Sequence, residues 1–119
     1  MPAIRTNILA TLGPVLIASL LAALSAGAAS AEDTVTLPLT IKDHRFEPAE
    51  VHAPAGKPIA LQVKNLGATA AEFESSVLHV EKVVAAGAEA LIHVRPLEPG
   101  RYKFFDDFHR ATEGYLVVP

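Results

Sequence analysis

The sequence GRYKFFDDFHRATEGYLVVP (Gly100–Pro119) contains two β-strand patterns separated by a polar segment. In the first pattern, Tyr102 and Phe104 alternate with polar residues, which is typical of a strand that buries one face. The second pattern is the apolar run 115–118. Two aspartates and a histidine stand between the two patterns. Acidic and imidazole side chains are therefore predicted at the end of a buried hairpin.

Short strand patterns of the same kind occupy most of the preceding chain. Turn residues separate them at intervals of roughly eight to twelve residues, which is typical of an all-β domain. In the segment 58–65, for example, Ile59, Leu61 and Val63 share one face. Further strands are predicted at 34–41, 49–53, 89–95, 101–106 and 115–118, and 77–84 is read as a strand or an irregular connection. No window after residue 32 has helical periodicity. These features predict an all-β fold, a two-sheet Greek-key sandwich of about seven strands.

The strand faces also predict which side chains form the core. Pro38 lacks an N–H group, so the strand at 34–41 is expected at a sheet edge. The segment 68–76 has no regular pattern and is not predicted as a strand. The predicted core consists of Ile41, Phe46, Val51, Ile59, Leu61, Val63, Ile92, Val94, Tyr102, Phe104, Leu116 and Val118.

Residues 1–31 have the pattern of a secretory signal peptide. Arg5 is followed by an uncharged run rich in Leu, Ile and Ala, which ends in the small residues ASA at 29–31. We therefore expect cleavage after Ala31, leaving one soluble domain, 32–119, in the periplasm. The uncharged run is also about long enough to cross roughly 30 Å of hydrocarbon, so a retained membrane anchor is the alternative.

The composition limits the chemistry that the chain can perform. Cysteine is absent and the single methionine is Met1, so disulfides and thiolate metal ligands are excluded. Thirteen Asp and Glu residues outnumber ten Lys and Arg residues, for a net charge of −3. This charge argues against nucleic acid as a partner and is compatible with cations. No phosphate-binding loop, zinc-protease motif or nucleophile elbow is present.

Three motifs in order resemble the cupredoxin family over nearly the whole segment 32–119. They are RFEPAEVHAPAGKPIALQVKN (Arg45–Asn65), EFES (Glu72–Ser75) and PGRYKFFDDFH followed by EGYLVV (Pro99–Val118). The resemblance implies the sandwich fold and a metal site at one end of it. Tyr102, Phe104, His109 and Gly114 match the aromatic residues, the histidine and the glycine of the family's final hairpin.

The departures from the family pattern concern the copper ligands. Asp106 stands where ordinary cupredoxins have the copper cysteine, and Thr112 or Glu113 stands where they have methionine. Glu72 aligns with the first copper histidine. The chain is in this respect similar to the Cys-less periplasmic branch found with bacterial ferrous-iron uptake systems, and EFES, EKVV (Glu81–Val84) and FFDDFH carry that narrower resemblance. It implies an inner-membrane iron permease and a periplasmic iron-binding protein as partners.

Oxygen and imidazole donors are thus expected to converge where relatives bind copper through sulfur. His109 is the expected imidazole ligand, and Asp106 and Glu72 are the expected anionic ligands. Glu74 and Asp107 are expected as outer partners or alternative ligands. Carboxylates and imidazole suit iron or manganese better than a blue-copper centre, which requires a thiolate.

Strand phase predicts where these side chains point. Asp106 is in phase with Phe104 and should point inward, where a buried carboxylate requires a metal or hydrogen-bond donors. Asp107 should point toward solvent, unless the chain bends there. Glu72 and Glu74 share one face of an extended segment, so a solvated acidic rim is the alternative to a ligand role.

The other histidines are weaker candidates. His44 precedes a turn and could approach the same end of the sandwich, whereas His93 lies opposite the core phase and is expected to be exposed. His52 and His79 have no evident partner in the sequence.

The function expected from these features is binding of Fe²⁺ or Fe³⁺ and help with iron oxidation or delivery to a permease. An accessory ferroxidase role remains open, because one redox-inactive site cannot oxidise iron without an electron acceptor. The alternatives are a periplasmic copper-binding protein that uses several histidines, and a metal-free docking or structural sandwich. Copper and manganese therefore stay open as metals.

Overall fold

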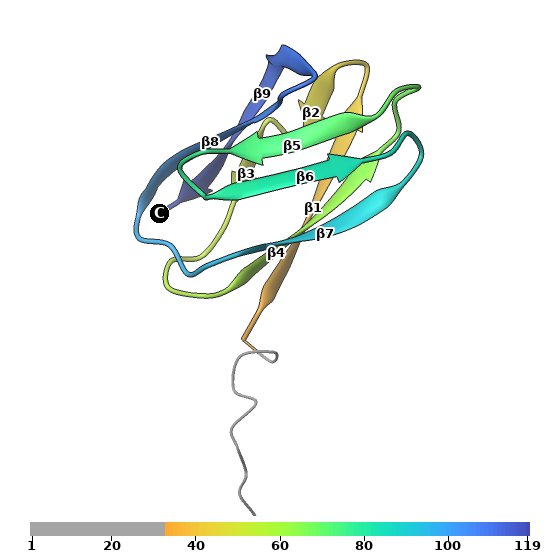
Figure 1. Ribbon diagram of the computed structural model, residues 1–119. Coiled ribbons are helices and arrows are strands. Elements are labelled where there is room, and N and C mark those ends of the chain that lie inside the picture. Colours follow the sequence, from red (N-terminus) through yellow and green to blue (C-terminus); the bar gives the residue numbers. More distant parts are fainter. Residues whose placement is uncertain (1–32) are drawn as a thin grey trace, which may run out of the picture.

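The computed structural model describes residues 33–119, and within that range every regular element is a β-strand (Figure 1). The predicted signal peptide, 1–31, lies outside the described residues. The described part of the chain holds no helix of the length and hydropathy needed to cross a membrane. The strands are β1 (Val35–Lys42), β2 (Arg45–Glu47), β3 (Glu50–His52), β4 (Ile59–Asn65), β5 (Ala71–Ser75), β6 (Val80–Val84), β7 (Glu89–Val94), β8 (Gly100–Asp106) and β9 (His109–Val118).

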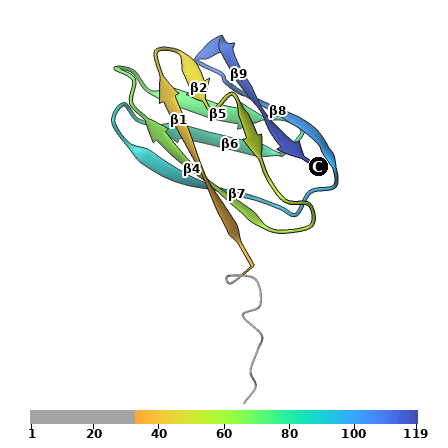
Figure 2. The ribbon, with the colours of Figure 1, turned by 180° about the vertical axis from the view of Figure 1, so that it is seen from behind.

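The strands form two mixed sheets that pack face to face as a sandwich (Figures 1 and 2). One sheet has the order β2-β1-β4-β7 and the other the order β3-β9-β8-β5-β6. Each sheet contains one parallel pair, β1 with β4 and β3 with β9, and its other pairs are antiparallel. The all-β sandwich prediction is confirmed.

The described range contains nine strands where about seven were predicted. The first difference is β2, three residues long, which pairs with the end of β1. The second is β5, which pairs with both β6 and β8 and lies within the less regular stretch 68–76. Since β5 has neighbours on both sides, pairing within the sheet determines its conformation more than its own composition does.

Pro38 lies in the part of β1 that has a neighbour on one side. Strand β1 pairs with β4 from Val35 to Ile41, whereas β2 covers only Thr40–Lys42. Pro38 therefore sits along a locally open edge, where a missing N–H group costs no ladder hydrogen bond. The prediction of an edge strand is therefore wrong for β1 as a whole, which lies between β2 and β4, although Pro38 itself lies where β1 has one neighbour.

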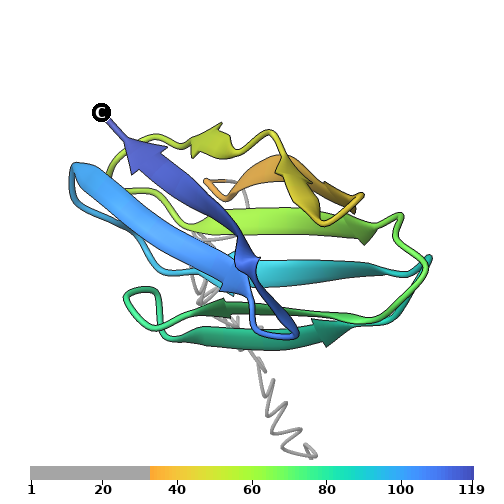
Figure 3. The same ribbon diagram turned by 90° about the horizontal axis from the view of Figure 1, so that it is seen from above.

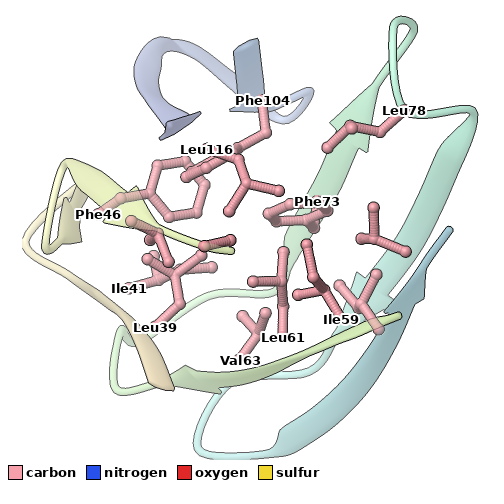
Figure 4. Close-up of a cluster of buried hydrophobic side chains, with 14 of the residues drawn as sticks. Leu39, Ile41, Phe46, Ile59, Leu61, Val63, Phe73, Leu78, Phe104 and Leu116 are labelled. Carbon is pink, nitrogen blue, oxygen red and sulfur yellow. The ribbon is translucent and has the colours of Figure 1, made fainter. Parts of the chain in front are cut away.

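Aliphatic side chains and three phenylalanine rings fill the space between the two sheets (Figure 4). Phe73 and Phe104 stack at a centroid separation of 5.0 Å, and Phe46 meets the Phe104 ring edge-on at 4.9 Å. Every predicted core residue is buried except Tyr102, which is half-buried and donates its hydroxyl hydrogen to the Glu98 carbonyl at 2.8 Å. The sequence reading omitted Phe73, which is fully buried. This residue belongs to the strand that was not predicted.

The β8–β9 hairpin turn lies at the end of the domain opposite the C-terminus (Figure 3). Gly114 permits the close pairing in this hairpin, because a Cβ atom there would lie 2.6 Å from Phe104 Cε2 and 2.8 Å from the Ala49 carbonyl oxygen. The register shifts between Phe105 and Asp106, so the end of the hairpin departs from the regular ladder. Such irregularities re-aim side chains near functional sites.

Candidate metal centre

Asp106 is buried at the end of β8 and both of its carboxylate oxygens are engaged. Oδ1 accepts hydrogen bonds from the backbone N–H of Glu72 at 2.9 Å and of Phe108 at 3.0 Å. Oδ2 lies 3.1 Å from His109 Nδ1. The inward orientation predicted from strand phase is confirmed, since Asp106 is 2% exposed. The carboxylate thus caps the hairpin and contacts the imidazole.

His109 has a second imidazole as its neighbour. The His44 ring lies 4.5 Å from the His109 ring, centroid to centroid, with an interplanar angle of 49°. Both rings line a pocket of about 290 Å³, together with Asp43, Asn65 and Asp106 among others. The expectation that His44 reaches the same end of the sandwich is confirmed by this contact.

The tight turn between β1 and β2 positions His44. Asp43 and His44 both adopt left-handed backbone conformations, with φ of 51° and 56°. Asp and His tolerate this region better than most residues other than glycine. Thr112 donates its hydroxyl hydrogen to the His44 carbonyl at 2.7 Å and so ties the turn to β9. The turn and the β8–β9 hairpin lie side by side in both views of the domain (Figures 1 and 2).

The acidic residues of the EFES motif form a different group. Ligand oxygens of Glu72, Glu74 and Asp107 lie within 4.8 Å of one another. Since Phe73 points into the core, the flanking Glu72 and Glu74 point to the outer face of their sheet. The Asp107 N–H donates to the Glu72 carbonyl at 2.9 Å, which brings the start of the hairpin turn next to β5. We call these three residues the acidic cluster.

Burial and neighbouring acidic groups shift the pKa values of Glu72 and Glu74 in the acidic cluster. A hydrogen bond with Glu81, burial, and the charges of Glu81, Asp107 and Glu74 raise the pKa of Glu72 from its ordinary value of 4.5 to about 7. Burial and the charge of Asp107 raise the pKa of Glu74 as well. Arg110 forms an ion pair with Asp107, with Nη2 2.9 Å from Oδ1, but the two groups are not aligned as a hydrogen bond. The Arg110 guanidinium does not restore the ordinary pKa values of Glu72 and Glu74.

The five predicted site residues therefore fall into two groups. Asp106 and His109 meet at the sandwich end, and Glu72, Glu74 and Asp107 meet on the outer face of the five-stranded sheet. Asp106 is the last residue of β8 and Asp107 begins the hairpin turn, so these consecutive aspartates belong to different groups.

Two further residues belong beside these groups. Glu81 was named in the EKVV motif but not as a site residue, and it lies in register with Glu74 on the next strand. Its signal in the sequence is a single acidic residue on the segment that follows EFES across a short turn. His44 completes a pair of imidazoles, and its only signal in the sequence is its position before a turn.

These features define a class of molecule, a two-sheet β-sandwich with nitrogen and oxygen donors gathered near its hairpin ends. A model of the family described as "Cupredoxin-like domain" matches residues 15–118. The chain belongs to this family. An uncharacterised protein of Rickettsia prowazekii (strain Madrid E) is 40% identical over 88 residues, which are 73% of this chain and 70% of the relative.

Solved structures share the fold at low sequence identity. The metal-binding domain of the Cu(I)-exporting P-type ATPase of Streptococcus pneumoniae, determined with Cu(I), matches with a TM-score of 0.64 and 16% identity over 73% of this chain and 87% of that chain. A variant of amicyanin in its reduced Cu(I) form matches with a TM-score of 0.57 and 18% identity over 71% of this chain and 82% of that chain. These likenesses concern the fold.

The donors at the sandwich end do not fit a blue-copper centre. Such a centre requires a cysteine thiolate with two imidazoles and a weak axial ligand. This chain has no cysteine, and the oxygens of Asp106 already bind two backbone N–H groups and contact an imidazole. Electron transfer through a blue-copper ion is therefore not a function that these residues support.

Proposed function

We propose that this protein binds iron as a cargo, with the acidic cluster as its iron site. The observation that carries the proposal is the convergence of Glu72, Glu74 and Asp107 oxygens within 4.8 Å. A single ion with several oxygen ligands at about 2.0–2.2 Å would fit among donors at that separation. Glu81 supplies a fourth carboxylate beside Glu72.

The electrostatics of the acidic cluster support a cation of high charge density. The hydrogen bond with Glu81, burial and the neighbouring carboxylates raise the pKa of Glu72, and burial and the neighbouring carboxylates raise that of Glu74, so the ionised forms of both are disfavoured without a cation. A bound cation would reverse this effect by stabilising the ionised carboxylates. Oxygen donors suit hard or borderline ions, and each carboxylate stabilises Fe³⁺ more than Fe²⁺ because of its higher charge.

The cellular role in this proposal is an accessory in ferrous-iron uptake. The signal-peptide pattern of residues 1–31 supports export to the periplasm. The resemblance to the Cys-less branch supports delivery to an inner-membrane permease, with a periplasmic iron-binding protein as a further partner. Oxidation of Fe²⁺ at this site requires an external electron acceptor, so binding and delivery are the proposed activities.

The test is a titration of the purified protein with Fe²⁺ under anaerobic conditions, repeated with Mn²⁺ as an air-stable ion of similar ligand preference. Glu74→Gln and Asp107→Asn each remove one anionic donor and should weaken binding of both ions. Glu98→Gln, outside the acidic cluster, is the control and should leave binding unchanged. Equal affinities in all four proteins would remove the acidic cluster as the iron site.

A further inference from the structure

We infer that Arg110 is a specificity-determining residue of the acidic cluster, where its guanidinium lowers the affinity for metal ions and disfavours trivalent ions more than divalent ones. The inference rests on the proposed function, since it takes the acidic cluster as the iron site. It is carried by the ion pair between Arg110 and Asp107. The guanidinium is a cation that the chain itself supplies to these carboxylates.

The β8–β9 hairpin brings Arg110 to the acidic cluster. Asp106 and His109 form the last pair of the ladder, so Asp107 lies in the turn. Arg110 follows on β9, and its Nη2 atom lies 2.9 Å from Asp107 Oδ1. Burial and neighbouring carboxylates raise the pKa of Glu74, and the charge of Arg110 opposes them. The guanidinium therefore acts on a second carboxylate of the acidic cluster as well.

The ion pair leaves the carboxylate oxygen available to a metal. Asp107 Oδ1 is buried and accepts no hydrogen bond, so its lone pairs can bind a cation. The Arg110 side chain is 78% exposed, and it meets this oxygen without the alignment of a hydrogen bond. Exposed ion pairs contribute little to stability. The guanidinium can therefore move aside for a metal ion at a modest cost in free energy.

A bound ion and the guanidinium would be close neighbours. Carboxylate oxygens bind small cations at about 2.0–2.2 Å. An ion on Asp107 Oδ1 would thus lie within about 5 Å of Arg110 Nη2, because that oxygen and nitrogen are 2.9 Å apart. At about 5 Å in water, repulsion lowers the affinity by a factor of about 4 for each unit of charge on the ion. Side-chain movement and salt reduce this penalty, but it stays larger for a trivalent ion than for a divalent ion.

The consequence for the proposed function concerns the release of iron. Carboxylates alone stabilise Fe³⁺ more than Fe²⁺, because their attraction for an ion grows with its charge. A positive charge beside the acidic cluster opposes this trend and narrows the difference between the two ions. The acidic cluster then binds the divalent cargo without retaining the oxidised ion as tightly as carboxylates alone would. Such a site suits delivery to a partner better than storage.

The experiment compares the purified wild type with Arg110→Gln in two titrations, one with Mn²⁺ followed by electron paramagnetic resonance and one with Tb³⁺ followed by its luminescence. Tb³⁺ is the trivalent probe, because Fe³⁺ precipitates as hydroxide near neutral pH. Arg110→Gln should bind Mn²⁺ at least about 3-fold more tightly than the wild type does. Its gain in affinity for Tb³⁺ should be larger, about 10-fold or more.

Two further variants make the test specific. Arg101→Gln removes the same charge from the ion pair with Glu50, near the start of β8, and should leave both affinities unchanged. Arg110→Lys keeps a positive charge and should stay closer to the wild type than Arg110→Gln does. Thermal unfolding in the presence of a chelator checks that each variant is folded.

Salt dependence separates an effect of charge from a structural effect. The Debye length falls from about 30 Å at 0.01 M salt to about 3 Å at 1 M, so the difference in affinity between Arg110→Gln and the wild type should shrink across this range.

Three results would overturn the role of Arg110 and leave the acidic cluster as the iron site. They are a Mn²⁺ affinity that is unchanged or lower in Arg110→Gln, a gain for Tb³⁺ no larger than that for Mn²⁺, and a difference that persists undiminished at high salt. Absence of Mn²⁺ binding in both proteins would instead remove the iron site itself, and the role of Arg110 with it.

Discussion

The carboxylate of Asp106 accepts a hydrogen bond from the backbone N–H of Glu72, 34 residues earlier in the chain, at 2.9 Å. The next residue, Asp107, returns a bond from its own N–H to the Glu72 carbonyl, also at 2.9 Å. Two consecutive aspartates therefore fasten the end of the β8–β9 hairpin to β5. This fastening places the acidic cluster on one face of the sheet and the imidazole pair near the other.

The first prediction concerns the stability contributed by this fastening. Asp106→Ala removes the acceptor of two backbone N–H groups, one of them buried, and should lower the free energy of unfolding by about 1–3 kcal/mol. Asp106→Asn keeps an oxygen acceptor and should lose less. Urea denaturation of the metal-free proteins measures both values, and equal stability of Asp106→Ala and the wild type would contradict the fastening role.

The second prediction concerns pH and Glu72. Because its pKa is raised from 4.5 to about 7 in the folded protein, the folded state binds more protons than the unfolded chain between those values. The resulting stability is fully present below pH 4.5 and is lost as the pH rises through 7. The melting temperature of the metal-free protein should therefore fall across this interval and level off above it.

Glu72→Gln tests the assignment of that pH dependence. The variant lacks the titrating carboxyl group and should show a flatter profile across the same interval, whereas Glu47→Gln, on β2 and outside the acidic cluster, should follow the wild type. Thermal unfolding with chelator at a series of pH values provides the measurement. A Glu72→Gln profile as steep as that of the wild type would refute the assignment of the pH dependence to Glu72.

The third prediction concerns the close pairing within the β8–β9 hairpin. Gly114→Ala places a methyl group 2.6 Å from Phe104 Cε2 and 2.8 Å from the Ala49 carbonyl oxygen, so core and backbone must both shift. We expect a loss of about 1–3 kcal/mol. Gly100→Ala, whose Cβ atom would meet only the Tyr102 ring at ordinary distances from 3.5 Å, is the matched control. Similar losses in both variants would exclude a special role for the hairpin contact.

The fourth prediction concerns the tie between Thr112 and His44. Thr112→Val keeps the shape of the side chain but removes the hydroxyl donor to the His44 carbonyl. The free energy of unfolding should fall by about 0.5–1.5 kcal/mol. Thr112→Ser keeps the hydroxyl donor and should retain most of the wild-type stability. Amide hydrogen exchange in the β1–β2 turn should rise in the Val variant only; unchanged exchange would mean that the turn is held by other contacts.

The sequence predicted the fold well because most strands have a clear apolar face. Alternation in β4 and β8 assigned the core residues Leu61 and Phe104 correctly. It failed at β5, where both faces are covered: Phe73 fills the core while Glu72 is also largely buried, at 9% exposure. The alternation of β5 covers only five residues inside the less regular stretch 68–76, which is too short a pattern to identify a strand.

The candidate site could be predicted in composition but not in arrangement. The inward orientation of Asp106 follows from strand phase, and the shared face of Glu72 and Glu74 follows from their spacing. The division into two groups depends on where the hairpin turn crosses β5, which is set by long-range pairing between Asp106 and Phe73. The contact of His44 with His109 likewise joins turns far apart in the sequence.

The most direct test of the acidic cluster as an iron site is a crystal of the protein grown anaerobically with Fe²⁺ and measured at the iron absorption edge. The account predicts an anomalous peak bounded by carboxylate oxygens of Glu72, Glu74 and Asp107. Well-diffracting crystals with iron located only between His44 and His109, or with no bound iron at saturating concentration, would contradict it.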